Sequence, residues 1–176
     1  MDKYRIPHVK TFEYTKIIGL KNIEFGQNII IDDFVLIYAT NRMKIGSHVH
    51  IASFTSITGG SEFIMDDFSG ISQGCRILTG SEDFKGWGFG NPTIPEKYRN
   101  TKREKVTIGK FCLVGANSVV LPGVSISEGA VVGAGSVVSK DLEAWGIYVG
   151  NRKVGERDST SVLKIYDKYL KEIAYE

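Results

Sequence analysis

Large apolar residues recur along this chain at a spacing of six, and this period constrains the fold more than any other feature of the sequence. The first three groups begin 20 residues apart, at Phe25, Ile45 and Met65, and after an interruption the same beat runs from Ile108 to Val138. The positions that keep one phase are Phe25, Ile31, Ile37, Ile45, Ile51, Ile57, Met65, Ile71, Ile77, Ile108, Val114, Val120, Ile126, Val132 and Val138.

A period of six fits neither the turn of an α-helix nor the simple alternation of a hairpin strand. Short strands joined by corners do fit it, because three hexads close one triangular coil and stacked coils enclose the apolar side chains in a narrow prism. Small or branched residues lie two positions earlier and should fill the tighter part of that interior. They are Val49, Thr55, Cys75, Cys112, Ser118, Val124, Ala130 and Ser136. The two cysteines are therefore predicted to be reduced core residues.

The overall composition argues against several classes of protein. With 22 basic and 20 acidic residues the formal charge is +2, which is too small to indicate a nucleic-acid partner or an anionic membrane. No apolar run reaches the roughly 18 residues that a membrane span needs, so we expect a cytoplasmic protein without membrane insertion. A length of 176 residues is typical of one domain, and 20 glycines against 4 prolines indicate many tight corners.

The repeated motif is [LIV]-G-x-x-[STAV]-x, most regular in IGKFCLVGANSVVLPGVSISEGAVVGAGSVVSKDL, from Ile108 to Leu142. This pattern resembles the hexapeptide-repeat family, and the run is similar to the coenzyme A end of bacterial galactoside- and maltose-type sugar O-acetyltransferases. The resemblance implies an all-β fold, a left-handed parallel β-helix, in a single domain over 1–176. We expect an N-terminal cap over 1–24, the β-helix over 25–142, a closing segment over 143–158 and a C-terminal α-helix over 159–176.

The expected C-terminal helix has an apolar face. Leu163, Tyr166, Leu170 and Ile173 follow helical spacing, behind Asp158 or Ser159 as an N-cap. We expect this helix to fold onto the prism. Membrane binding is the less favoured alternative, because its other face mixes acidic and basic residues.

Interruptions of the period all follow the third hexad of a coil, so they should stack along one edge of the prism. Two are short, and the third is a long excursion over 80–105 that is rich in glycine and aromatic residues. A long ordered loop in a compact domain is usually functional. In the family such a loop reaches over the site of an adjacent subunit, which implies a homotrimer with active sites between subunits.

The resemblance also implies acetyl-CoA as co-substrate, bound by backbone groups of stacked coils. The matching positions are Ala116, Ala134, Gly135, Ser139 and Lys140. Arg152 and Lys153, in the closing segment, are candidates for binding the phosphates, because coenzyme A needs cations there. An ordinary solvated basic tail is the alternative.

Acetyl transfer needs a general base, donors for the oxyanion and alignment of both substrates, but no metal. Galactoside-type enzymes keep a histidine at the start of the loop, where this sequence has Glu82 followed by Asp83. Two assignments therefore stay open. In one, His50 is the base or positions the acetyl group, since GSHVHIA is similar to a stretch in N-acetyltransferases of nucleotide-linked amino sugars. In the other, Glu82 or Asp83 is the base, or orients His50 across a subunit boundary. His48 is predicted to be a corner residue.

The acceptor is expected to lie against the loop, where Trp87 and Tyr98 can stack on sugar faces and Asn91 and Arg99 can bind hydroxyls. We predict an acyltransferase that moves acetyl from acetyl-CoA to a sugar hydroxyl by general-base direct transfer, in surface polysaccharide (O-antigen or capsule) biosynthesis. The alternative is N-acetylation of the amine of a nucleotide-linked amino sugar.

Two other classes of protein fit the sequence less well. A carbonic anhydrase on the same prism needs three histidines that converge on zinc, and the third histidine, His8, lies outside the repeats. A structural or ice-binding β-helix would show flat threonine columns and no aromatic loop.

Overall fold

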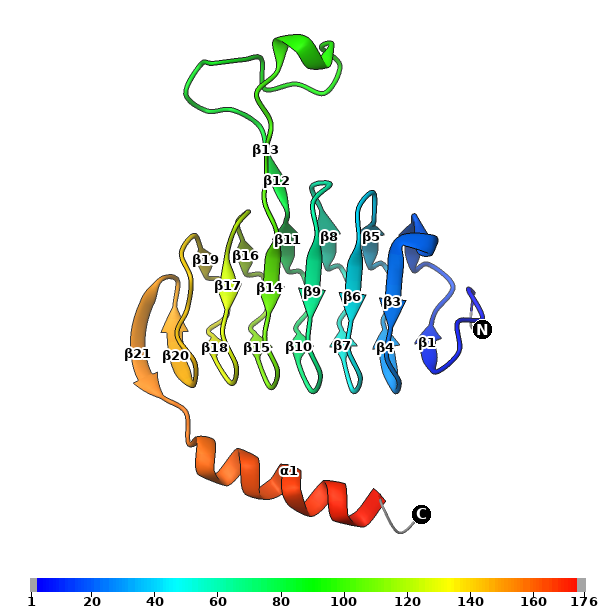
Figure 1. Cartoon of the computed structure of the whole chain (residues 1–176), viewed down its shortest axis with the longest axis vertical. Helices are drawn as coiled ribbons and strands as arrows, with labels where there is room; N and C mark the ends of the chain where they lie inside the picture. Colours follow the sequence, from blue (N-terminus) through cyan, green and yellow to red (C-terminus); the bar gives the residue numbers. More distant parts are fainter. Residues whose placement is uncertain (1–2, 174–176) are drawn as a thin grey trace.

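The computed structural model describes residues 3–173 and folds them into a parallel β-solenoid of about seven coils, followed by one helix (Figure 1). Each complete coil contributes one short strand to each of three sheets, which form the faces of a prism, and the last two coils contribute fewer. Sheet A consists, in spatial order, of β1 (Val9–Thr11), β4 (Ile29–Ile31), β7 (His50–Ile51), β10 (Gly70–Ile71), β15 (Leu113–Val114), β18 (Val131–Val132), β20 (Gly146–Val149) and β21 (Arg152–Glu156).

The other two faces have the same construction. Sheet B consists of β19 (Val137–Val138), β16 (Val119–Val120), β11 (Arg76–Leu78), β8 (Ser56–Thr58), β5 (Leu36–Tyr38) and β2 (Lys16–Ile18). Sheet C consists of β17 (Ser125–Ile126), β14 (Val106–Ile108), β9 (Phe63–Met65), β6 (Met43–Ile45) and β3 (Ile23–Phe25). A 3₁₀-helix, η1 (Leu20–Asn22), precedes β3.

Parallel pairing in register stacks the apolar residues of successive coils on top of each other, for example Ile31 on Ile51 and Ile71 on Val114. All in-phase residues from Ile31 onward are at most 1% exposed, and only Phe25 is partly buried. Every residue of the predicted second column is also buried, including Cys75 and Cys112, which are free thiols. The predicted parallel β-helix and its interior are therefore confirmed.

The solenoid extends further at both ends than the expected 25–142. Thr11 and Ile17 are buried and pair in register with Ile31 and Ile37, so the first coil lies within the expected cap. Thr11 and Ile17 continue the spacing of six, but the sequence pattern does not show it clearly because Thr11 is polar. At the other end, Tyr148 pairs with Val132 in sheet A and is 4% exposed. Its distance of ten residues from Val138 breaks the spacing of six.

The interruptions lie along one edge of the prism, between sheets B and C, as predicted. From the end of β11 the chain leaves the prism through β12 (Gly80–Ser81) and returns through β13 (Lys102–Arg103), which pairs antiparallel with it. The loop between them, which includes the 3₁₀-helix η2 (Glu96–Tyr98), projects beyond the solenoid at the top of Figure 1.

The C-terminal helix, α1 (Ser159–Ile173), runs beside the edge between sheets A and C, at the bottom of Figure 1. Residues 174–176 of the expected helix lie outside the described residues. The helix contacts the prism through Tyr166 and Tyr169, whose rings make T-shaped contacts with the ring of Phe68. The expected face is therefore only partly right: Leu163 and Leu170 remain 40% and 39% exposed. At this corner the prism presents the aromatic rings of Phe68 and Phe111, and the rings of Tyr166 and Tyr169 pack against them.

Candidate active site

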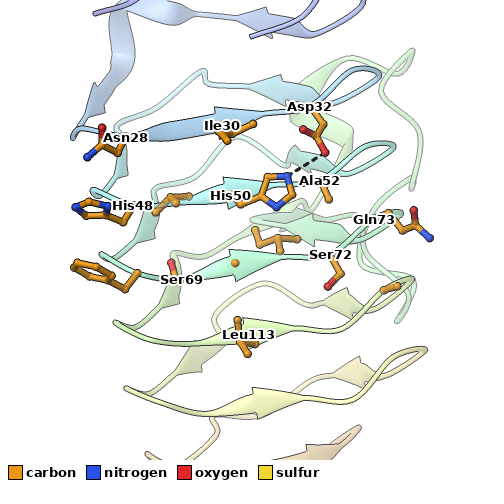
Figure 2. A pocket seen from close by; sticks show the side chains of 15 residues that line it. Asn28, Ile30, Asp32, His48, His50, Ala52, Ser69, Ser72, Gln73 and Leu113 are labelled. Carbon is orange, nitrogen blue, oxygen red and sulfur yellow. Dashed lines mark hydrogen bonds and ion pairs between the residues drawn. The ribbon is translucent and has the colours of Figure 1, made fainter. Parts of the chain in front are cut away.

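An open groove of about 890 Å³ lies on the outward face of sheet A, across β4, β7, β10 and β15 (Figure 2). We call it the sheet A groove. Its floor is formed by residues that point outward from these strands, and its sides by the residues at the two corners of the sheet. His50 lies in its centre, Phe68 and His48 at one corner, and Asp32 and Ala116 at the other.

His50 is placed in the groove by strand alternation, because its neighbour Ile51 points into the core. The imidazole is 54% exposed, and its Nε2 lies 3.0 Å from Oδ2 of Asp32 (Figure 2). A carboxylate only accepts hydrogen bonds, so the proton of this bond is on Nε2. The lone pair of Nδ1 is then free to accept a proton from a substrate.

Asp32 is the residue that sequence reasoning missed. It follows β4 at the corner towards sheet B, one coil before His50, and its backbone N–H donates to the carbonyl of Ile51 at 3.0 Å. These coils repeat every 20 residues, so Ile30 lies directly beside His50 on the neighbouring strand. Asp32, two residues after Ile30 and 18 before His50, therefore lies diagonally next to the histidine. A search for acidic residues at that offset would have found the pair.

His48 has a structural role, consistent with its predicted corner position. Its backbone is left-handed, with φ at 57°. The ring stacks on Phe68, with centroids 4.4 Å apart, and meets the edge of Tyr169 at 5.5 Å. It therefore forms part of the surface on which α1 is seated.

The two loop carboxylates bind within the loop. Glu82 pairs with the guanidinium of Arg99 and accepts a hydrogen bond from Thr101 Oγ1 at 3.1 Å. The hydrogen bond from Arg99 holds the pKa of Glu82 below its usual value, although desolvation opposes it. Asp83 accepts the backbone N–H groups of Lys85, at 2.8 Å, and of Trp87. A carboxylate base needs a raised pKa, so the contacts of Glu82 favour a role in holding the base of the loop.

The head of the loop has a cavity of its own, of about 540 Å³, between Trp87, Phe89, Lys97, Tyr98 and Arg99. Three of the four predicted sugar-binding residues, Trp87, Tyr98 and Arg99, therefore come together. Asn91 instead accepts hydrogen bonds from the backbone and hydroxyl of Thr93, at 3.0 and 2.9 Å. This cavity belongs to the projecting loop, on the edge between sheets B and C, whereas His50 is on sheet A. One chain does not bring the two groups together.

The predicted coenzyme-binding residues follow the groove toward the C-terminal coils. Ala116 lines it, and Gly135, in the next coil beside Ala134, donates its N–H to the Ala116 carbonyl at 2.8 Å. Ser139 and Lys140 follow β19, at the next corner of the same coil, between sheets B and C. Asn151, in the last coil, accepts their backbone N–H groups at its Oδ1, at 2.8 and 3.2 Å. Ala116 and Gly135 are thus stacked along the solenoid axis, whereas Ser139 and Lys140 lie at a different corner.

The two predicted phosphate ligands differ in their surroundings. Lys153 lies 2.6 Å from Glu156 and 3.3 Å from Glu143, and the hydrogen bond to Glu156 is the main cause that raises its pKa. Arg152 is exposed on the same strand, β21. Arg152 is therefore the better placed of the two cations for a phosphate.

Within residues 3–173, His, Cys, Asp and Glu side chains nowhere gather in a group of three that could hold a metal ion. The only α-helix in this range is α1, and it is too short and too polar to cross a membrane.

Comparison with known proteins gives a consistent picture. Residues 105–140 match a family model described as "Hexapeptide repeat of succinyl-transferase". The chain is 37% identical, over 81% of its own length and 75% of the relative's, to the dTDP-4-amino-4,6-dideoxy-D-glucose acyltransferase of Escherichia coli. It is 30% identical over 71% of its length, and 58% of the relative's, to a putative lipopolysaccharide biosynthesis O-acetyl transferase, WbbJ, of E. coli K12.

Among solved structures, the N-acyltransferase AntD from Bacillus cereus, in complex with dTDP and 3-hydroxybutyryl-CoA, superposes with a TM-score of 0.89. It is 35% identical, and the match covers 95% of this chain and 89% of AntD. A maltose O-acetyltransferase from Clostridium difficile shares the fold, with a TM-score of 0.66 at 18% identity over 80% and 73% of the two chains.

Proposed function

The chain belongs to the hexapeptide-repeat acyltransferase family, and on this basis we propose that it transfers an acyl group from acyl-CoA to the amine of a nucleotide-linked amino sugar. The observation that carries the proposal is the His50–Asp32 pair in the sheet A groove, at the end of the predicted coenzyme path. Two relatives support an amino-sugar acceptor. The E. coli protein is a dTDP-4-amino-4,6-dideoxy-D-glucose acyltransferase, and an AntD variant has been solved in complex with dTDP-4-amino-4,6-dideoxyglucose and coenzyme A. This favours the N-acyl alternative over the O-acetyl prediction.

In the proposed step the neutral amine attacks the thioester carbonyl, a C–N bond forms and the C–S bond breaks. The nitrogen loses one proton to Nδ1 of His50, and the imidazolium passes this proton to the departing thiolate, so that the products are an amide and coenzyme A and His50 is neutral again. Asp32 holds the imidazole in the required tautomer and stabilises its cationic form.

We place the coenzyme along the path from Arg152 to Ala116. Its phosphates lie at Arg152 and Lys140, the pantetheine follows Ser139, Gly135 and Ala134, and the thiol reaches the groove beside Ala116. Backbone groups at these coil corners can bind an extended chain whose own groups alternate amide and methylene. Lys153 contributes less, because two carboxylates already neutralise it.

The acceptor needs a second copy of the chain. The loop-head cavity offers aromatic rings with Lys97, a combination suited to a base or sugar and to a phosphate, while Arg99 is already paired with Glu82. It lies on a different edge of the prism from His50, and Trp87 is 72% exposed. In a homotrimer the loop of one subunit can cover the sheet A groove of the next, which brings both halves together.

The experiment is a steady-state assay of coenzyme A release with two matched acceptors, dTDP-4-amino-4,6-dideoxyglucose and the same nucleotide with a hydroxyl in place of the amine. Acetyl-CoA and 3-hydroxybutyryl-CoA serve as donors, and mass spectrometry identifies the product. We expect an amide product with the amine alone. Turnover of the hydroxyl acceptor only would support the O-acetyl alternative instead, and absence of acyl-CoA binding in calorimetry would contradict both.

A further inference from the structure

Among the parallel strands of sheet A, β1 to β20, one outward-facing position has no side chain, and it lies next to His50. Gly70 on β10 pairs in register with His50 on β7 and with Leu113 on β15. Neighbouring strands are roughly 4.8 Å apart, so the backbones of His50 and Leu113 are separated by roughly 10 Å. Figure 2 shows the two side chains on either side of the strand whose ends are marked by Ser69 and Ser72. Between them only backbone forms the floor.

The backbone does not require glycine at this position. Gly70 is not among the glycines with a left-handed φ, and a Cβ built on it would meet only Leu113 Cδ2, at 3.5 Å. The repeat glycines behave differently, because a Cβ on Gly46 would lie 2.7 Å from the backbone N of Asp67 and one on Gly115 2.5 Å from that of Ala134. Those glycines permit the coils to stack. Gly70 instead leaves open space in the groove.

This open space is lined by apolar atoms on the side away from His50. Leu113 is 44% exposed, and its side chain leans over the Gly70 backbone. An exposed leucine against a bare strand offers a short apolar slot, which is a suitable environment for hydrocarbon and not for a sugar ring.

We propose that the slot between His50 and Leu113, over Gly70, holds the acyl chain of the donor, and that the missing side chain admits acyl groups longer than acetyl. This inference rests on the proposed function. The predicted coenzyme path runs from the C-terminal coils to Ala116, so a thioester that reaches His50 passes β15 and β10 in that order. The thiol lies beside Ala116, at the corner between sheets A and B, so the thioester enters the groove from the side of His50 that faces Asp32. With the carbonyl beside the imidazole, the acyl chain can turn over the neighbouring bare floor at Gly70.

The test compares donors in wild type, Gly70→Ala, Gly70→Val and Leu113→Ala. For each protein, calorimetry gives the affinity for acetyl-CoA, 3-hydroxybutyryl-CoA and unacylated coenzyme A, and the assay gives kcat/KM for both donors. In Gly70→Val we expect the preference for 3-hydroxybutyryl-CoA over acetyl-CoA to fall roughly tenfold to a hundredfold, because the added methyl groups overfill the slot. Gly70→Ala should give a smaller fall, and Leu113→Ala should shift the preference toward the longer donor.

The result that overturns the inference is an unchanged ratio between the two donors in Gly70→Val, in a protein that still binds coenzyme A and melts at the wild-type temperature. If Gly70→Val does not fold, an unchanged ratio in Leu113→Ala overturns it equally. Failure of the proposed function is a separate outcome. In that case the wild-type protein either binds none of the thioesters, or binds them but acylates no amine. If it binds them without turnover, the ratio of the affinities for 3-hydroxybutyryl-CoA and acetyl-CoA still tests the role of Gly70.

Discussion

Nε2 of His50 lies 3.0 Å from Oδ2 of Asp32, a residue of the preceding coil, and both side chains line the sheet A groove. The pair brings together a strand position and a corner position that lie 18 residues apart in the sequence. It gives the imidazole the tautomer that leaves Nδ1 free to take a proton.

Replacement of Asp32 by asparagine should lower kcat and leave KM for acyl-CoA nearly unchanged. An amide can bind Nε2 in either direction, so the tautomer of His50 is no longer fixed. Since a positioned base contributes on the order of a hundredfold or more, we expect His50→Ala to lose about that factor and Asp32→Asn a smaller part of it. Steady-state kinetics measures this. Asp33→Asn, which changes the adjacent carboxylate, is the control, and an equal loss in it would contradict the assignment.

Arg152→Ala should raise KM for acyl-CoA by several-fold, whereas Lys153→Ala should have a smaller effect. The ammonium of Lys153 is shared between Glu143 and Glu156, while Arg152 is exposed on β21. Calorimetry with coenzyme A and with dephospho-coenzyme A would show whether the loss involves a phosphate. A larger effect from Lys153→Ala would reverse the assignment of the two cations.

Glu82→Gln should loosen the loop without unfolding the solenoid. Arg99 lowers the pKa of Glu82, so this pair stabilises the loop at neutral pH, and the stabilisation is lost as the pH falls through the depressed pKa. Limited proteolysis should therefore cut wild type within 80–105 more readily in acid than at pH 7, and should cut Glu82→Gln readily at both. Glu96→Gln, at an 87% exposed carboxylate, is the matched control. Equal cleavage of the three proteins at pH 7 would argue against this role.

Tyr166→Ala should release α1 from the prism. The ring packs edge-on against Phe68 and Phe111, at 5.1 Å from each, and the Lys110 ammonium lies 3.9 Å from its centroid. Each such contact is worth about 0.5–1.5 kcal/mol, so the loss should exceed that from Leu163→Ala, at a 40% exposed position. Hydrogen exchange should accelerate in residues 159–173 and remain slow in the coils. Unchanged protection of α1 would show that the ring contacts do not hold it.

Both cysteines should resist thiol reagents in the native protein. Burial raises the pKa of Cys112 to about 12 and also raises that of Cys75, so almost no thiolate exists at pH 8. Titration with a chromogenic disulfide should detect no thiol before unfolding and two in urea. The same reagent can then follow coenzyme A release in the assay. Rapid labelling of the folded protein would mean that the coils open locally.

The spacing of residues along the chain is enough to predict the prism, its two interior columns and the edge on which the interruptions stack. These follow from spacing alone, because one short period repeated many times leaves a single way to bury its apolar residues. The same logic placed His50 on the outside of a strand next to Gly70.

Which side chains come into contact depends on how the coils stack and how the loop folds. Asp32 reaches His50, and Glu82 is bound by Arg99, because coils stack at a fixed rise and the loop folds on itself. No local sequence motif predicts either contact. The position of α1 also depends on tertiary structure. The rings of Phe68 and Phe111 come together only when distant coils are stacked, and Tyr166 and Tyr169 are the helix residues whose rings contact them.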